Sequence, residues 1–224
     1  MSEKVDKENS KVSFFRHVGI SLFTGIFVLV LAIISVILFF VLINHEDYKN
    51  LAVQEAFISE MILSMLTAVS VIVAMLKIRR FRYTHHRNVE LDNILLIVGQ
   101  IGIYLFSIFS IISGHLAHTG LLNNFVIFSS LSRLIQATLQ TIFILDASQR
   151  VASSAADANR KPGREMVTFL LVCNFAMWII TTLETGRHDS NSIQLRFFGF
   201  WGWTIIARIS TPLAIFYRFH STKI

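Results

Sequence analysis

Long apolar runs separated by short polar segments dominate this chain. Each run has about 20–25 residues, which is the length that an α-helix needs to cross a bilayer. Lipid offers no hydrogen-bond partners to the backbone, and none of the runs alternates like a barrel strand, so we expect helices. The six runs cover residues 19–43, 56–78, 91–113, 124–146, 165–186 and 196–218. The pattern predicts an all-α polytopic membrane protein with six transmembrane helices in a domain spanning 19–218, between a cytosolic N-terminal tail (1–18) and a cytosolic C-terminal tail (219–224).

Composition supports a chain that faces lipid. Hydrophobic residues make up 54% of the 224 residues and charged residues only 15%, whereas a soluble domain usually carries about 25% charged residues. The net charge of +6 comes from basic clusters beside the apolar runs, which is typical of membrane orientation signals rather than of a nucleic-acid surface. The first run is longer than the roughly 7–15-residue core of a signal peptide, so we expect it to remain in the mature protein.

The distribution of Lys and Arg predicts the orientation, because cytoplasmic segments carry the excess of positive charge. One set of alternating segments carries 15 of these residues and the opposite set only 3. Both termini therefore belong to the cytosolic side. The larger set is Lys4, Lys7, Lys11, Arg16, Lys77, Arg79, Arg80, Arg82, Arg87, Arg150, Arg160, Lys161, Arg164, Arg218 and Lys223; the smaller set is Lys49, Arg187 and Arg196.

Several amides and one tyrosine lie at similar depth in the inner half of the predicted bundle. Gln140 and Asn174 lie about 9 and 13 Å from the inner ends of their spans at 1.5 Å per residue, and Tyr217 closes the last span on that side. Gln136 is one helical turn from Gln140 on the same face. These residues can form a polar constriction; alternatively, they form interhelical hydrogen bonds that only hold the bundle together.

A second group of ionisable residues lies toward the outer side. Glu60 and Glu184 are near span ends, and His115, His118 and His188 are in or beside outer loops. Carboxylates and imidazoles exchange protons between roughly pH 4 and 7. The glutamates are candidates for a proton path and the histidines for extracellular pH sensing, with an ordinary solvated interface as the alternative.

Two arginines fall inside predicted spans. Arg133 and Arg208 should each pair with a carboxylate, a carbonyl group or trapped water rather than face lipid, but the pattern does not select their partners. Pro212 removes a backbone hydrogen bond in the last span, so we expect a kink near Thr211.

The residue patterns of common membrane enzymes are missing. Cys173 is the single cysteine, and all eight histidines lie at span ends, in loops or in tails, so neither paired haem ligands nor a cysteine metal site is expected. We find no HExxH motif, no phosphate-binding loop and no intramembrane Ser/His or paired-Asp arrangement. We therefore expect neither an enzyme nor a bound cofactor.

Four sequence blocks resemble one family. They are LDNILLIVGQIG (91–102), LQTIFILDA (139–147), KPGREMVTFLLVCN (161–174) and PLAIFYRFHS (212–221). Together they resemble the C-terminal half of otopetrin proton channels over about 56–221, and residues 1–55 match only as a tail and a generic span.

The resemblance implies a proton channel of the plasma membrane that admits protons to the cytosol in response to extracellular acid. Otopetrin subunits have twelve spans in two six-span halves and pair as dimers, so this chain has the form of a half-repeat. The family's Gln–Asn–Tyr constriction carries over to Gln140, Asn174 and Tyr217, and Glu184 matches an acidic position near the outer mouth. The partners implied are protons, the lipid bilayer, and either further copies of this chain or full-length otopetrin-like subunits.

The departures from the family pattern keep other functions open. The chain has half the family's length, and Arg208 stands where an uncharged residue or His is expected. A non-conducting truncated isoform or half-subunit that assembles with full-length partners is therefore the main alternative. A proton-coupled transporter is a third class, although the sequence offers no pair of helices broken by Gly or Pro.

Overall fold

The computed structural model describes residues 2–79, 81–83, 90–117, 120–151, 163–183 and 192–221. Within these ranges six long helices carry the fold, accompanied by a short 3-10 helix, η1 (Glu46–Tyr48), and two short strands, β1 (Arg82–Tyr83) and β2 (Arg150–Val151). The long helices are α1 (Ser2–Ile43), α2 (Lys49–Ile78), α3 (Glu90–Leu116), α4 (Leu121–Ser148), α6 (Arg164–Leu183) and α7 (Ser192–His220).

The all-α class predicted from the apolar runs is confirmed, and each run falls on one long helix. In the described part of the chain, four helices are long and apolar enough to cross a membrane: Gly19–Ile43, Glu46–Ile78, Glu90–Leu116 and Glu165–Leu183. Helices α4 and α7 are as long but more polar, because they carry residues such as Gln136 and Arg218. Membrane character therefore rests on four helices, and the count of six spans stays a prediction.

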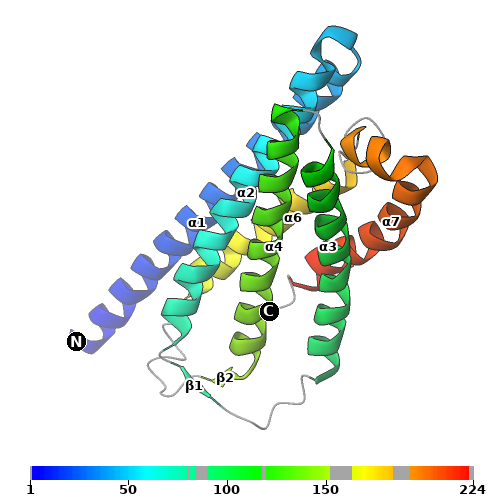
Figure 1. The fold of residues 1–224 in the computed structure, drawn as a ribbon. Coiled ribbons are helices and arrows are strands. Elements are labelled where there is room, and N and C mark those ends of the chain that lie inside the picture. The colour runs from blue at the N-terminus through cyan, green and yellow to red at the C-terminus, as the bar shows by residue number, and fades with distance from the viewer. Residues whose placement is uncertain are drawn as a thin grey trace.

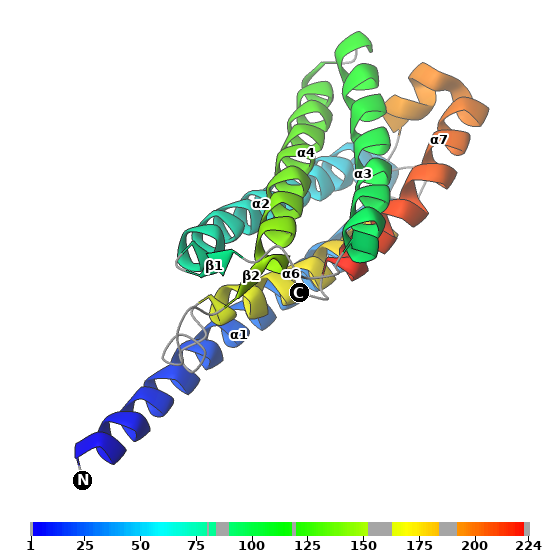
Figure 2. The same ribbon diagram turned by 90° about the horizontal axis from the view of Figure 1, so that it is seen from below.

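The helices form a closed ring. In order around it, α1 packs on α2, α2 on α4, α4 on α3, α3 on α7, α7 on α6, and α6 on α1, while α2 also touches α6. Figures 1 and 2 show the α1–α6 pair running at a clear angle to α3 and α4. Since α2 touches α6 directly, α2, α4, α3, α7 and α6 enclose the interior, and α1 packs against α2 and α6 beside it.

The distribution of polarity between interior and exterior is the reverse of that in a soluble protein. Large apolar side chains cover the outside, including Phe23, Ile62, Leu91 and Trp201, each more than half exposed. A contiguous apolar exterior of this kind suits contact with lipid. Polar side chains fill much of the interior instead; among those buried are Ser64, Gln100, Ser107, Gln136, Gln140 and Asn174.

Helices α3 and α7 approach each other closely at Gly102. A Cβ atom added there would lie 2.6 Å from the Ser210 carbonyl oxygen, so only glycine allows this distance between the helices. The kink in α7 lies at Gly199 (φ 74°, ψ 166°), and the torsion angles beside Pro212 remain helical. This glycine break, which lies about three turns before Thr211 at 3.6 residues per turn, was not predicted from the sequence; a kink at Pro212 itself stays a prediction.

Contacts between helix ends place three of them on one side of the ring. Strands β1 and β2, which follow α2 and α4, pair antiparallel, and Lys77 at the end of α2 forms an ion pair with Glu165 at the start of α6. This arrangement matches the alternation that the basic segments predict. Which side is cytosolic remains a prediction.

Candidate functional site

A line of polar residues follows the inward face of α4. We call Ser129, Arg133, Gln136 and Gln140 the α4 polar stripe. Their spacings of four, three and four residues place them on one helical face, and all four are buried. At 1.5 Å per residue the stripe extends over about 16 Å, which is roughly half the thickness of a bilayer's hydrocarbon core.

The Ser129–Arg133 end of the stripe holds a buried ion pair between α2 and α4. The Arg133 guanidinium pairs with the Glu60 carboxylate, and both residues are only 8% exposed. Ser129 Oγ donates a hydrogen bond to Glu60 Oε2 at 3.0 Å, and the Arg133 guanidinium lies 5.0 Å from the centre of the Phe106 ring. The sequence pattern did not select a partner for Arg133, and the structure identifies Glu60 as that partner. Glu60 lies inside the ring rather than at a water-facing mouth.

The Gln136–Gln140 end of the stripe is a cluster of amides joined by an arginine. Gln136 Nε2 donates to Gln140 Oε1. Arg218 Nη1 of α7 donates to Gln136 Oε1 at 2.8 Å and to Asn174 Oδ1 of α6 at 3.4 Å. Asn174 Nδ2 in turn donates to the Leu170 carbonyl oxygen at 2.9 Å. Arg218 therefore connects α4, α6 and α7 at one level of the interior.

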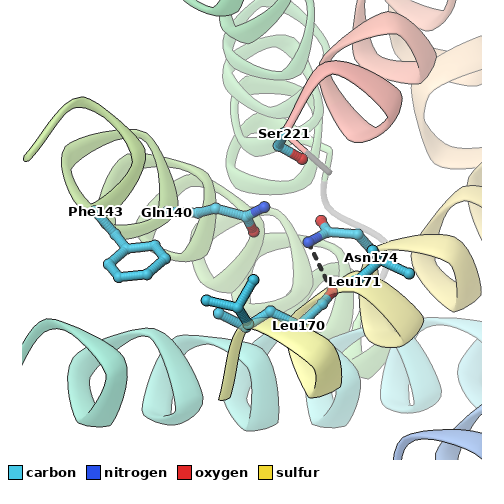
Figure 3. Close-up of a pocket in the computed structure, with 7 residues that line it drawn as sticks. Gln140, Phe143, Leu170, Leu171, Asn174 and Ser221 are labelled. Carbon is cyan, nitrogen blue, oxygen red and sulfur yellow. Dashed lines mark hydrogen bonds between the residues drawn. The ribbon is translucent and has the colours of Figure 1, made fainter. Parts of the chain in front are cut away.

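Gln140 and Asn174 face one another across a small cavity (Figure 3). Phe143 and Leu170 contribute apolar walls, and Ser221 lies beside the two carboxamides. The centre of a water molecule can move within about 10 Å³ of this cavity, so the cavity has room for roughly one water. A single water here would have two amide groups as partners.

Tyr217 of α7 is fully buried, and it packs against a different face of α4 from the one that carries the stripe. Its hydroxyl group donates to the Ala137 carbonyl oxygen at 2.9 Å and lies 2.9 Å from Thr141 Oγ1. It does not line the cavity between Gln140 and Asn174. The structure therefore brings these two amides together and places Tyr217 beside them, next to Arg218 in the chain.

Arg218 is the member of this buried cluster that sequence reasoning missed. We assigned it to the basic residues at the cytosolic boundary, yet it is only 4% exposed and points into the amide cluster. A basic residue at the end of an apolar run is usually an interface marker. The only signal for burial was its place in the same sequence block as Tyr217.

The other sequence candidates lie away from the stripe. His115 is exposed near the end of α3, whereas His118, Glu184 and His188 lie outside the described residues. Arg208, which we expected to pair inside the protein, is exposed on the outer face of α7. Its neighbours Ile205 and Ile209 are also exposed there, because this face of α7 turns away from the ring.

Four strongly apolar helices, an apolar exterior and a polar interior define a polytopic all-α membrane protein. The family model that matches residues 16–219 is that of otopetrin. This chain belongs to the otopetrin family.

Three relatives show how far the similarity extends. The proton channel OtopLc of Drosophila melanogaster is 48% identical over 203 residues, which cover 90% of this chain and 13% of OtopLc. Human proton channel OTOP3 is 26% identical over 175 residues, covering 59% of this chain and 29% of OTOP3. Human proton channel OTOP2 is 32% identical over 73 residues, covering 33% of this chain and 13% of OTOP2. The chain thus spans well under a third of the length of these relatives.

Proposed function

We propose that this chain forms a proton-conducting path through the interior of the helix ring. The observation that carries the proposal is the row of buried polar groups along the interior, from the Glu60–Arg133 ion pair to the amide cluster of Gln136, Gln140 and Asn174. Polar and ionisable groups inside a membrane are energetically expensive, so those that are present usually serve helix packing or transport. The names of the relatives, all proton channels, agree with the transport role.

The chemistry of the stripe suits protons better than hydrated ions. Amides and hydroxyls both donate and accept hydrogen bonds, so Gln140 and Asn174 can orient a water molecule between them. A proton can hop along such a hydrogen-bonded chain through a space that admits only about one water. A sodium ion would instead need room for its own hydration shell.

We place this path in the plasma membrane, with six spans and both termini in the cytosol. The basic segments favour that orientation, and α4 and α7 are of similar length to the strongly apolar helices α2 and α3 and pack against them in the ring. Proton influx would then be driven by extracellular acid. In this arrangement Gln136, Gln140, Asn174 and Tyr217 form or flank the inner constriction, and Glu184 and the histidines at 115, 118 and 188 face the outer solution.

The small share of the relatives' length that this chain spans favours a second candidate function. As a half-subunit, it would assemble with another copy or with a full-length otopetrin-like protein and would not conduct alone. The two functions make opposite predictions for cells that express only this chain.

The deciding experiment is whole-cell recording with intracellular pH imaging while the bath is stepped to acid. An inward current whose reversal potential follows the proton gradient supports conduction by this chain. No current, with the protein verified at the cell surface, supports the half-subunit function, and co-expression with a full-length relative should then alter that relative's current.

The residues of the constriction are tested in the same cells. We expect Gln140→Leu and Asn174→Leu each to abolish the proton current without preventing surface delivery, because leucine cannot orient a water molecule. Thr24→Val is the matched control, because Thr24 is an exposed α1 residue that bonds only its own helix. Normal currents in both leucine variants would remove these two residues from the path.

A further inference from the structure

A second cavity lies between α3, α4, α6 and α7, and two arginines line it. They are Arg133 and Arg218, joined by Thr181, Thr211 and the apolar ring of Phe106. The centre of a water-sized molecule or ion can move within about 10 Å³ of this cavity, so it has room for one such ligand. It is distinct from the cavity between Gln140 and Asn174 and is lined by cations rather than by amides.

The charges around this cavity do not balance. Both arginines are more than nine-tenths buried, and Glu60 pairs with Arg133. The hydrogen-bond partners of Arg218 are the neutral oxygens of Gln136 and Asn174. Among these groups there are two positive charges and one negative charge. Buried charge is costly unless a counter-charge accompanies it, and within the described residues one of these two positive charges has no counter-charge.

The cavity also has hydrogen-bond donors to spare. Nε of Arg133 is buried and has no partner within the described part of the chain. Arginine donates hydrogen bonds but cannot accept them. Threonine hydroxyls can donate as well, so Thr181 and Thr211 add two further donors to the wall. A guest that only accepts hydrogen bonds and carries negative charge satisfies the charge and the donors together.

We propose that the cavity between Arg133 and Arg218 binds a small monovalent inorganic anion of the chloride class. Its one-water size excludes bulky organic anions, and Phe106 contributes an apolar part of its wall. The bound anion would neutralise the charge next to Gln136 and Asn174. It would therefore lower the electrostatic barrier that Arg218 presents to a proton at the amide cluster.

The test is equilibrium binding of radioactive chloride to the purified full chain in detergent micelles, at constant ionic strength with gluconate as the replacing anion. We expect saturable binding of one chloride per chain, with competition by bromide but not by gluconate. This measurement does not require proton conduction, so its failure is distinguishable from failure of the proposed function. Absence of saturable binding, or equal competition by gluconate, would overturn the proposal.

Matched variants locate the site. Arg218→Gln should weaken chloride binding about tenfold or more, because a charge-assisted hydrogen bond is lost. Arg208→Gln removes the same charge from the same helix at an exposed position and should leave binding unchanged. Thr211→Val keeps the volume and every charge and should weaken binding roughly threefold to tenfold, the loss of one neutral hydrogen bond.

The threonine variant keeps the proposal testable if Arg218→Gln fails to fold. Wild-type affinity in Thr211→Val and in a folded Arg218→Gln would refute the location. An equal loss of binding in Arg208→Gln would refute it too, since a general effect of positive charge would then explain the result.

Discussion

The buried Glu60–Arg133 ion pair should control the stability of the ring. Glu60→Gln removes the carboxylate but leaves the Arg133 guanidinium at 8% exposure with an Nε that already has no partner in the described residues. Breaking a buried pair by removing one partner costs about 3–5 kcal/mol, because the remaining charge is uncompensated. The hydrogen bond from Ser129 to Glu60 can survive with the amide oxygen.

The double variant isolates the interaction. In Glu60→Gln/Arg133→Gln no charge is left at this site, and two amides of similar size can bond each other. Replacing both members of a buried pair is often nearly neutral, so the double variant should be at least about 2 kcal/mol more stable than the sum of the single losses predicts. Ser129→Ala is a smaller perturbation and should cost about 1 kcal/mol, the typical contribution of one hydrogen bond.

The assay is unfolding of the purified chain in mixed micelles as the fraction of denaturing detergent rises. The three tryptophans provide the fluorescence signal. A Glu60→Gln variant within about 1 kcal/mol of the wild type, or strictly additive losses in the double variant, would refute our reasoning about the pair.

Three further predictions test other contacts. Gly102→Ala should lower stability by about 1–3 kcal/mol, the usual cost of overpacking, because the new methyl group meets α7 at the Ser210 carbonyl oxygen; an unchanged unfolding midpoint would contradict the close approach. Tyr217→Phe should cost about 1 kcal/mol, because it leaves the Ala137 carbonyl oxygen without its donor; the same detergent titration measures it. Arg150→Met should raise the protease sensitivity of the adjoining segments while leaving the midpoint nearly unchanged, since Arg150 donates to Asp146 and to the Phe81 carbonyl oxygen at the edge of the fold; wild-type cleavage rates would contradict this.

Arg150 lies beyond the predicted end of the fourth span, in the strand pair β1–β2. The hydrogen bond to the Asp146 carboxylate raises the pKa of the Arg150 guanidinium above its ordinary value. Raising the pH within the neutral range therefore leaves the arginine charged and the ion pair intact. Arg150 Nε lies 2.7 Å from Asp146 Oδ2, an ion pair that the i, i+4 spacing on one helix favours.

The helices could be predicted from the sequence because lipid and helix length together limit what an apolar run can become. The prediction was least complete where polarity depends on tertiary structure. Helices α4 and α7 are the least apolar of the six because their inward faces carry the polar stripe and Arg218. Length and packing identify them as members of the ring, but a hydropathy average does not.

Only those features of the site that depend on spacing along a single helix could be predicted from the sequence. Gln136 and Gln140 could be placed on one face from their separation alone, whereas the pairing of Glu60 with Arg133 depends on how α2 meets α4. Depth along the membrane placed Tyr217 level with the amides but could not give its direction around the helix. Arg218 was missed because a basic residue at the end of an apolar run has the same sequence pattern in both cases. Its side chain can extend outward to lipid headgroups or inward to other side chains, and the sequence does not distinguish the two.

The order of the helices along the chain bears on how the protein is made. If α4 crosses the membrane, as the six-span proposal requires, a lone Arg133 entering lipid would cost about 2.5–3.5 kcal/mol on insertion scales. Because α2 precedes α4 in the chain, Glu60 has already left the ribosome when α4 is inserted and can form the ion pair with Arg133. Helix α7 follows α4 and α6 along the chain, so Arg218 emerges after Gln136 and Asn174, the residues that it contacts. The polar helices thus follow their partners during translation, and co-translational insertion can proceed without exposing either arginine to the bilayer alone.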